Sequence, residues 1–323
     1  MIPLGTSERL TDWTAAIGWR LSFANFLAPR DPVVLMYHGV PEHAEGSLLD
    51  AASFENQIRF LKHNFEIISP QQREIRTKGR GRVQALLTFD DGFRSNAEIA
   101  APILRRHGVP ALFFVASRHA RPGSYLWFTY IRVLSDYFQD NGFTFRGEFM
   151  DMSRSARTAT IGRLTRTLFE MEPHPQAMYK AIETELPPFS DFVSQNEMDA
   201  RGAGITADQM SELARDELFH FGAHTVDHPL LTRCSDAEAL RQLRENKAWI
   251  EQTTRRTCDT IAYPMQDYDG RVIELCKQVG FRHGYSVTKT LNVDAAFEIP
   301  RVGVYRKSLD RLGLKVRWAT ILY

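Results

Sequence analysis

The sequence predicts an α/β fold with a mostly parallel β-sheet, and three observations lead to this prediction. Short apolar runs that are typical of buried strands recur along the chain. Between most of these runs lie stretches whose apolar residues repeat at helical spacing. Polar residues directly follow several of the runs, and in parallel α/β folds the chemistry gathers at the carboxyl ends of the strands.

The predicted strands are five short apolar runs. Their lengths suit strands better than the longer helices of globular domains. In chain order they are "VVLMY" (33–37), "ALLTF" (85–89), "ALFFV" (111–115), "LFHFGA" (218–223) and "TIAY" (260–263). Alternation of such strands with helices is typical of βαβ units, which build parallel sheets.

The predicted helices between these strands carry their apolar residues on one face. Four segments have such a face: 54–65, 99–108, 240–250 and 272–280. Ser235, followed by Glu238 three residues later, predicts the N-cap of the third of these helices. Gly280 predicts the C-terminal end of the fourth.

Residues 120–205 break the alternation of strands and helices. The stretches "WFTYIRVLSDYF", "IGRLTRTLFEM" and "AMYKAIETEL" have helical patterns, and the turns "MEPHP" and "LPPFSD" separate them. Because the strand–helix signal resumes at once beyond this region, we interpret it as a helical insertion and not as a separate domain.

A helical segment at 1–30 is predicted ahead of the main domain. Four apolar residues recur there at helical spacing: Leu10, Trp13, Ile17 and Leu21. This helix either packs on the domain or lies on a membrane surface. Positive charge is sparse in this segment, which favours packing on the domain.

Composition excludes several classes of protein. The hydrophobic fraction of 43% and the charged fraction of 24% are those of a soluble globular protein, and the net charge of +1 gives no basis for a nucleic-acid partner. Three scattered cysteines are too few for a disulfide framework or a cysteine zinc site. We find no secretory signal and no run that could span a bilayer, so a cytoplasmic location is expected, with membrane association through the N-terminal helix as an option. The sequence does not indicate an oligomeric state.

Two adjacent carboxylates raise the first question about function. In "LLTFDDGFRSN" (86–96), Asp90 and Asp91 stand side by side where a buried strand is predicted to end. Aspartate and glycine are common in turns, so a turn alone explains this stretch. Two carboxylates at a strand end can also serve one site, one as a metal ligand and the other as a base.

The stretch "FGAHTVDHPLL" (221–231) favours the site over the simple turn. His224 and His228 follow another apolar run and are four residues apart, so both imidazoles can reach one metal ion. Two histidines and one carboxylate make an open zinc site with positions for water and substrate. A cation on Asp91 would also remove the like-charge problem, because Asp90 could then stay ionised and act as a base.

"TFDDG" (88–92) together with "HTVDHP" (224–229) resembles the metal motifs of the polysaccharide deacetylases, the family built on the NodB homology domain. The resemblance covers most of residues 31–305 outside the insertion. It includes "VLMYHGV" (34–40), "FENQIRFLKHNFEIIS" (54–69), "ITADQMSEL" (205–213), "IAYPMQDYD" (261–269) and "EIPRVGV" (298–304). The "YHGV" and "AYP" stretches resemble the branch associated with bacterial cell-surface and exopolysaccharide sugars. This resemblance implies a distorted (β/α) barrel over residues 31–323, with the helical insertion at 120–205.

The resemblance also implies roles for individual residues. Asp90 matches the general base, Asp91 matches the carboxylate ligand, and His224 and His228 match the metal histidines. The oxyanion of the reaction would be held by the metal and by the backbone N–H at Met265. The implied cofactor is a divalent metal ion: His-His-Asp ligation favours zinc, with cobalt and nickel as alternatives.

The general acid departs from the family pattern. Many members carry it as a histidine in a Leu-His-Asp-like stretch near the C-terminus, and "RLGLKVRWATILY" (311–323) has none. His38, which follows the apolar run at 33–37, is the first candidate to return the proton to the leaving amine, and His283 is the second. The alternative for His38 is a structural histidine bonded to a backbone carbonyl.

Two further departures concern the stretch "IAYPMQDYD" (261–269), which matches the third motif of the family. Many members have an arginine two residues before its proline, where this chain has Ala262. Arg301 could supply that charge from a neighbouring strand, and the alternative for Arg301 is a surface salt bridge. Gln266 stands where this branch usually has a small residue, so we expect its side chain to crowd or reshape the sugar site.

The residues predicted to contact substrate are aromatic or belong to the third motif. They are Phe93, Trp127, Tyr263 and Pro264. Sugar rings stack on aromatic side chains, which makes Trp127 at the start of the insertion a candidate. Helix packing inside the insertion is the alternative for Trp127.

The predicted function is metal-dependent hydrolysis of an N-acetyl group on an amino sugar, with Asp90 as the base. The sugar would belong to a polysaccharide, an oligosaccharide or a lipid-linked glycan intermediate. Two alternatives stay open: a hydrolase of a non-sugar amide or an O-acetyl ester, and a non-catalytic barrel that binds glycans. The complete pair of motifs argues against a binder, because binding needs no base beside a metal.

Overall fold

The computed structural model describes residues 32–44, 48–74, 82–171, 173–287 and 293–322. The helical segment predicted at 1–30 lies outside the described residues. Among the helices of the described ranges, none has the length and apolarity needed to cross a bilayer.

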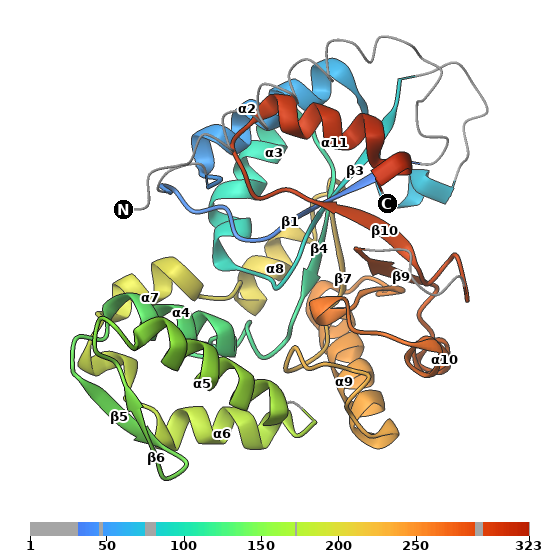
Figure 1. Ribbon diagram of the computed structural model, residues 1–323. Helices are drawn as coiled ribbons and strands as arrows, with labels where there is room; N and C mark the ends of the chain where they lie inside the picture. Colours follow the sequence, from blue (N-terminus) through green and yellow to red (C-terminus); the bar gives the residue numbers. More distant parts are fainter. Residues whose placement is uncertain (1–31, 45–47, 75–81, 172, 288–292, 323) are drawn as a thin grey trace.

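A ring of parallel strands forms the centre of the described chain (Figure 1). Neighbouring strands follow the order β1-β10-β9-β8-β7-β4-β3, and pairing between β1 and β3 closes the ring. The strands are β1 Val33–Tyr37, β3 Gln84–Phe89, β4 Ala111–Val115, β7 Phe219–Ala223, β8 Thr260–Ala262, β9 His283–Ser286 and β10 Ile299–Gly303. A short β2, Glu66–Ile67, pairs with the start of β3 outside the ring. This closed ring confirms the predicted distorted (β/α) barrel.

Helices surround the barrel (Figure 1). They are α2 Ala51–Asn64, the π-helical turn η3 Asn96–Ala100, α3 Ala101–His107, α8 Ala207–Leu213, α9 Asp236–Thr254, α10 Gly270–Val279 and α11 Leu309–Leu322. Ser235 caps α9 by accepting the backbone N–H of Glu238 at 3.3 Å. Gly280 ends α10 at a φ of 87°, a left-handed conformation that glycine adopts at little cost. Both helix ends lie where the sequence predicts them.

All five predicted strands are present, and β9 and β10 complete the ring. Their sequences, "HGYS" and "IPRVG", contain glycine, proline and serine, which are poor strand formers. They become strands because their neighbours in the ring offer backbone partners: β9 pairs with β8 and β10 pairs with β1.

The inside of the barrel changes from apolar to polar along the strands. Successive strand residues point to opposite sides, so β3 divides its side chains between two clusters. Leu87 packs in the large core between strands and helices, whereas Leu86 belongs to a smaller apolar cluster contributed by the other side of the strands. Thr88 and Asp90 continue the alternation of Leu86 and are both buried. The strand pattern therefore directs Asp90 to the inner, polar end of the barrel.

The predicted insertion forms a separate cluster of helices beside the barrel (Figure 1). Its elements are α4 Trp127–Tyr137, β5 Gly142–Phe145, β6 Glu148–Asp151, α5 Arg157–Met171, α6 Pro175–Glu185, the short 3₁₀ turn η4 Phe189–Asp191 and α7 Gln195–Gly202. Helices α4, α5 and α6 and the two strands share an apolar core of their own, and Met198 of α7 packs in a smaller cluster beside α4. The β5–β6 hairpin is a correction to the all-helical prediction, and its turn residues Arg146 and Gly147 both have positive φ, as a tight hairpin turn requires.

The insertion returns to the barrel at the loop after β3. The backbone N–H of Arg94 donates to the carbonyl of Ala203 at 2.8 Å, and the N–H of Ile205 donates to the carbonyl of Gly92 at 2.8 Å. The end of the insertion is thus bonded directly to the loop that carries the two aspartates.

Candidate active site

Four side chains from two strands meet at the carboxyl end of the barrel. Asp90 and Asp91 follow β3, His224 and His228 follow β7, and their relative exposures are only 2–3%. Strand β4 lies between β3 and β7 in the ring. The two sequence motifs therefore converge in space although they come from non-adjacent strands.

The turn after β3 separates the two aspartates. The N–H of Asp90 donates to the carbonyl of Tyr37 at 3.0 Å, which extends the pairing of β3 with β1. Asp91 and Gly92 then adopt φ angles of 72° and 75°. A Cβ on Gly92 would lie 2.7 Å from a methyl carbon of Val115, so both the conformation and the space require glycine. The stretch is therefore a turn, as its composition predicts, and this turn also directs the two carboxylates toward different partners.

Asp91 faces both histidines at distances that suit a shared metal ion. Its Oδ1 lies 3.3 Å from Nε2 of His224 and 3.4 Å from Nε2 of His228. Charge-assisted hydrogen bonds between nitrogen and carboxylate are shorter, about 2.7–2.9 Å. Zinc bonds to nitrogen and oxygen ligands place neighbouring donors of a tetrahedral site roughly 3.4 Å apart. The spacing is that of ligands around a small cation.

The second ring nitrogen of His224 fixes the direction of its imidazole. Nδ1 lies 2.8 Å from the carbonyl oxygen of Ala262, which can only accept, so Nδ1 carries the hydrogen. In the neutral ring, Nε2 then presents a lone pair toward Asp91, and two acceptors face each other. A cation or an extra proton between them removes the repulsion between the two acceptors. A hydrogen bond from the second ring nitrogen to a backbone carbonyl is usual for histidine ligands of metals. The backbone of His224 is held as well, by Oδ1 of Asn246 at 3.0 Å.

His228 is held differently. Its Nδ1 is buried and has no hydrogen-bond partner among the described residues. Its ring instead contacts the ring of Phe128 from the insertion, with centroids 5.4 Å apart and planes at 69°. The backbone N–H of His228 donates to Oγ1 of Thr225 at 3.0 Å.

The charges of this group fit a divalent cation. Burial raises the pKa of Asp91, but the contacts with His224 and His228 outweigh it and hold that pKa well below its usual range. Burial lowers the pKa of His228, which favours the neutral ring that a metal needs. Burial also opposes the charged form of His224, yet its contacts with the two aspartates raise its pKa overall. Asp91, His224 and His228, whose ligand atoms all lie within 4.8 Å of one another, are the residues that would hold the ion.

Asp90 does not join this group, because Arg301 binds it. Nη1 of Arg301 lies 2.6 Å from Oδ1 and Nη2 lies 2.8 Å from Oδ2, a two-pronged ion pair in which Arg301 is 1% exposed. The alternative of a surface salt bridge is therefore wrong for Arg301. This arginine stands on β10, which is separated from β3 by β1, so its side chain crosses the barrel interior to supply the charge that Ala262 lacks.

The ion pair keeps Asp90 charged in a buried position. Burial raises its pKa, but the charge of Arg301, the nearby His224 and the hydrogen bonds of Arg301 lower it overall. A carboxylate that stays ionised at neutral pH can accept a proton. The structure thus gives the two neighbouring aspartates different partners and different chemical capacities.

His38 follows β1 on the same edge of the barrel. It is half-buried, and its Nδ1 has no hydrogen-bond partner among the described residues, so the backbone-bonded structural histidine is not what is found at that nitrogen. Tyr37 pairs in register with Phe89, so His38 and Asp90, the residues that follow them, lie side by side at the ends of β1 and β3. The ring of Tyr305, which is 50% exposed, lies 5.7 Å from the His38 ring.

The third motif forms a tight turn after β8, the 3₁₀ segment η5 Pro264–Gln266. Met265 and Gln266 both have left-handed φ angles, 52° and 62°, and both side chains are exposed. The position of Gln266 is therefore one that glycine would occupy without strain, and its side chain is exposed, so its effect on a sugar site stays a prediction. Tyr263 is a correction: it is 1% exposed, donates to the carbonyl of Phe297 at 3.0 Å and stacks on Tyr268, so it supports the turn from below. Pro264 is buried as well.

Two other predicted positions are also corrected. His283 is the first residue of β9 and pairs in register with Thr260, the first residue of β8, so it lies at the amino end of the barrel, opposite Asp90. It cannot reach a leaving group beside Asp90. Trp127 is 3% exposed and packs in the core of the insertion, so the helix-packing alternative holds.

Phe93 lies beside the site and serves packing. Its ring contacts the ring of His119 edge to face at 5.0 Å, and its backbone forms a bridge with Gly204 of the insertion. Tyr305 and Asp227 are not among the residues predicted from the sequence. Both had a signal: Tyr305 follows a strand end, and Asp227 stands between His224 and His228.

Comparison with protein families gives one clear match. Residues 78–142 and 170–284 match the family model for polysaccharide deacetylase, which is more than half of the chain. A comparison with curated proteins finds no match.

Several solved structures share the fold. IcaB from Ammonifex degensii is 18% identical, with a TM-score of 0.57 over 90% of this chain and 98% of that chain. The deacetylase PplD from Streptococcus pyogenes, solved in complex with acetate, is 16% identical, with a TM-score of 0.56 over 88% of this chain and 97% of that chain. The BpsB deacetylase domain from Bordetella bronchiseptica is 16% identical, with a TM-score of 0.53 over 85% and 97%. The family match and the buried Asp-His-His group agree, and the chain belongs to the polysaccharide deacetylase family.

Proposed function

We propose that this protein is a metal-dependent hydrolase that removes N-acetyl groups from an amino sugar of a glycan. The observation that carries the proposal is the arrangement of the adjacent aspartates: Asp91 faces two histidines at ligand spacing, while Asp90 is held apart in an ion pair with Arg301. One site thus offers a metal-binding group and an ionised base side by side. The family match supports the class of substrate and reaction.

Each residue of the site has a separate role in the proposed hydrolysis. A divalent ion held by Asp91, His224 and His228 would polarise the acetyl carbonyl and lower the pKa of a water beside it. Asp90 accepts the proton of that water, because Arg301 keeps its carboxylate ionised and fixed in place. The water oxygen attacks the amide carbon, and the carbonyl oxygen gains negative charge.

Two residues at the edge of the site complete the proposed reaction. The backbone N–H of Met265, in the left-handed turn after β8, would donate to the carbonyl oxygen as it becomes negative. His38 would protonate the leaving amine, since it follows β1 beside the aspartates and its Nδ1 has no partner among the described residues. The carbon–nitrogen bond then breaks as its nitrogen takes the proton of His38, the amine and acetate are released, and the proton on Asp90 passes to solvent.

The metal and the substrate are proposed from chemistry and likeness. Two imidazoles and one carboxylate suit zinc, with cobalt and nickel as alternatives. The named structural relatives include IcaB and BpsB, and PplD was solved with acetate, the acid that this reaction would release. We propose a bacterial surface glycan, an exopolysaccharide or a lipid-linked intermediate as the source of the amino sugar.

The test is acetate release from N-acetylated oligosaccharides and glycolipids, with and without a chelator. The proposal expects release that the chelator stops and added zinc or cobalt restores. Asp90→Asn should lower the rate about 10²- to 10⁴-fold while the metal content stays at the wild-type level. Release from O-acetylated sugars alone would favour an esterase, and a metal-free chain that stays inert after metal addition would favour a glycan binder.

A further inference from the structure

We propose that the insertion positions one ligand of the metal centre, because Tyr179 on α6 and the carboxylate of Asp227 together hold the loop that carries His228. Both are positioning residues, since neither would touch the metal. This inference rests on the proposed function insofar as it assumes that His228 is a metal ligand.

The loop from Thr225 to His228 depends on support from other elements. Thr225 and His228 have φ angles of 65° and 58°, a region that residues with a Cβ rarely adopt. Within the loop, the N–H of His228 donates to Oγ1 of Thr225. The N–H groups of Val226 and Asp227 both donate to Oε1 of Gln242 on α9, at 3.0 and 2.8 Å. A strained turn of this kind keeps its shape only when its surroundings impose it.

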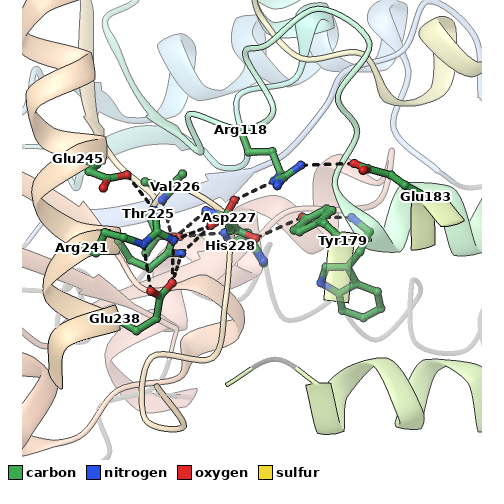
Figure 2. A network of polar contacts seen from close by, with 12 residues as sticks. Arg118, Tyr179, Glu183, Thr225, Val226, Asp227, His228, Glu238, Arg241 and Glu245 are labelled. Carbon is green, nitrogen blue, oxygen red and sulfur yellow. Dashed lines mark hydrogen bonds and ion pairs between the residues drawn. The ribbon is translucent and has the colours of Figure 1, made fainter. Parts of the chain in front are cut away.

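The carboxylate of Asp227 is the centre of that support (Figure 2). It is 2% exposed. Oδ1 accepts from Nε of Arg118 at 2.8 Å, and Oδ2 accepts from Nη2 of Arg241 at 2.9 Å and from Nε2 of Gln242 at 2.7 Å. Movement of this side chain away from its donors would leave the buried carboxylate without partners, so the loop is fixed to α9 and to the segment after β4.

Tyr179 adds the contact from the insertion (Figure 2). Its hydroxyl donates to the backbone carbonyl of Asp227 at 3.2 Å and accepts the backbone N–H of Trp127 at 3.4 Å. Its ring lies under the guanidinium of Arg118, 3.9 Å from the centroid. On the same helix, Glu183 lies 3.9 Å from Nη1 of Arg118. Tyr179 therefore contacts both the backbone of the loop and Arg118, which binds the carboxylate of Asp227.

This support has a larger effect on His228 than on His224. His224 is oriented by its own side-chain contact with Ala262, as histidine ligands usually are. His228 has no such contact among the described residues, so its ring direction follows from the backbone at Asp227 and from the ring of Phe128. Both of those restraints include residues of the insertion.

The test compares two tyrosines of the insertion, each reduced to phenylalanine. Tyr179→Phe removes the hydroxyl that bonds the loop. Tyr130→Phe is the matched control, because Tyr130 is also buried in the core of the insertion and its hydroxyl donates to the carbonyl of Pro187, away from the metal site. Each variant is titrated with Co²⁺ as the only probe, and the dissociation constant and the visible absorption spectrum are recorded.

The inference expects Tyr179→Phe to raise the Co²⁺ dissociation constant about tenfold and to change the cobalt spectrum, since contacts behind metal ligands commonly contribute 10- to 100-fold in affinity. Tyr130→Phe should match the wild type in both. Asp227→Asn should have the larger effect, about 100-fold. An unchanged constant and spectrum in Tyr179→Phe, or equal losses in both tyrosine variants, would overturn the inference while the proposed function stands. A wild-type chain that binds no Co²⁺ would overturn the proposed function itself.

Discussion

Two sides of the candidate site differ in burial and in the way their residues are held. The buried side consists of Asp90, Asp91, His224, His228 and Arg301, all at most 3% exposed. The open side consists of His38, Met265 and Tyr305, of which the last two are half exposed. On the buried side, a two-pronged ion pair holds Asp90 and Arg301, and Oδ1 of Asp91 faces both imidazoles. On the open side, Met265 has a strained backbone, and His38 lies beside an exposed ring.

Under the proposed function, this difference separates the chemical step from the recognition of substrate. Charges interact more strongly where water is excluded, so the buried side can fix the charge of a base and the geometry of a metal site. A glycan chain has to enter from solvent, so the residues that meet it have to stay accessible. Loss of a buried residue should therefore abolish the reaction or change its pH dependence, whereas loss of a residue on the open side should lower the rate by smaller factors.

The most severe test of the buried side is His224→Ala. Removing this ligand should lower acetate release to background and lose stoichiometric metal, because Asp91 and His228 alone give too few ligands. His220→Ala is a matched control on the same strand: His220 stands in β7 near its amino end, away from the site. Metal content by elemental analysis and acetate release are measured for both. Full metal content in His224→Ala would contradict the proposed ligand set.

Removal of His38 tests the open side with the next largest effect. His38→Gln should lower kcat about 10²-fold with metal content unchanged, since it removes the proposed donor of the proton to the amine. The decline of activity at high pH should also weaken, because that decline reports an acid that must stay protonated. His283→Gln, at the opposite end of the barrel, should behave like the wild type. Wild-type kcat in His38→Gln would exclude it as the acid.

The buried side was largely predictable from the sequence, because the positions of its aspartates and histidines follow from their immediate neighbours in the chain. Asp90, Asp91, His224 and His228 stand directly after apolar runs, so strand ends and short spacings place them at one edge of a parallel barrel. A motif that is continuous in sequence carries its own geometry, because the turn residues between the ligands set their directions.

The remaining features depend on contacts that are distant in the chain. Arg301 reaches Asp90 across 211 positions, so the sequence could name it as a candidate but could not decide between this ion pair and a surface salt bridge. His283 was misjudged because only the register of β9 against β8 shows at which end of the barrel it lies. Trp127 and Tyr263 are aromatic residues near motifs, but the packing of the insertion and of the turn buries them. Tertiary packing, which no short motif encodes, decides such cases.

Arg301→Met tests the electrostatics of the buried side. Arg301 lowers the pKa of Asp90 against the effect of burial, so its loss should raise that pKa. The base acts only when ionised, and activity is lost as the pH falls through its pKa. The acid limb of the pH–rate profile should therefore move to higher pH, by about 1–3 units. Arg301→Lys keeps the charge and should recover part of the shift. An acid limb that stays in place in Arg301→Met would show that another group controls the base.

The smallest predicted effect concerns Tyr305 on the open side. Its ring lies over Gly303, where a Cβ would come within 2.6 Å of the ring, and beside His38, yet half of its surface faces solvent. A sugar ring that approaches His38 can stack on this face, and aromatic contacts of this kind contribute about 0.5–1.5 kcal/mol. Tyr305→Ala should therefore raise KM for an N-acetylated oligosaccharide about three- to tenfold with kcat nearly unchanged. Tyr305→Phe keeps the ring and should retain the wild-type KM. If Tyr305→Ala instead lowers kcat at constant KM, the ring acts on His38 and not on the sugar, and the division between the two sides would have to be redrawn at this residue.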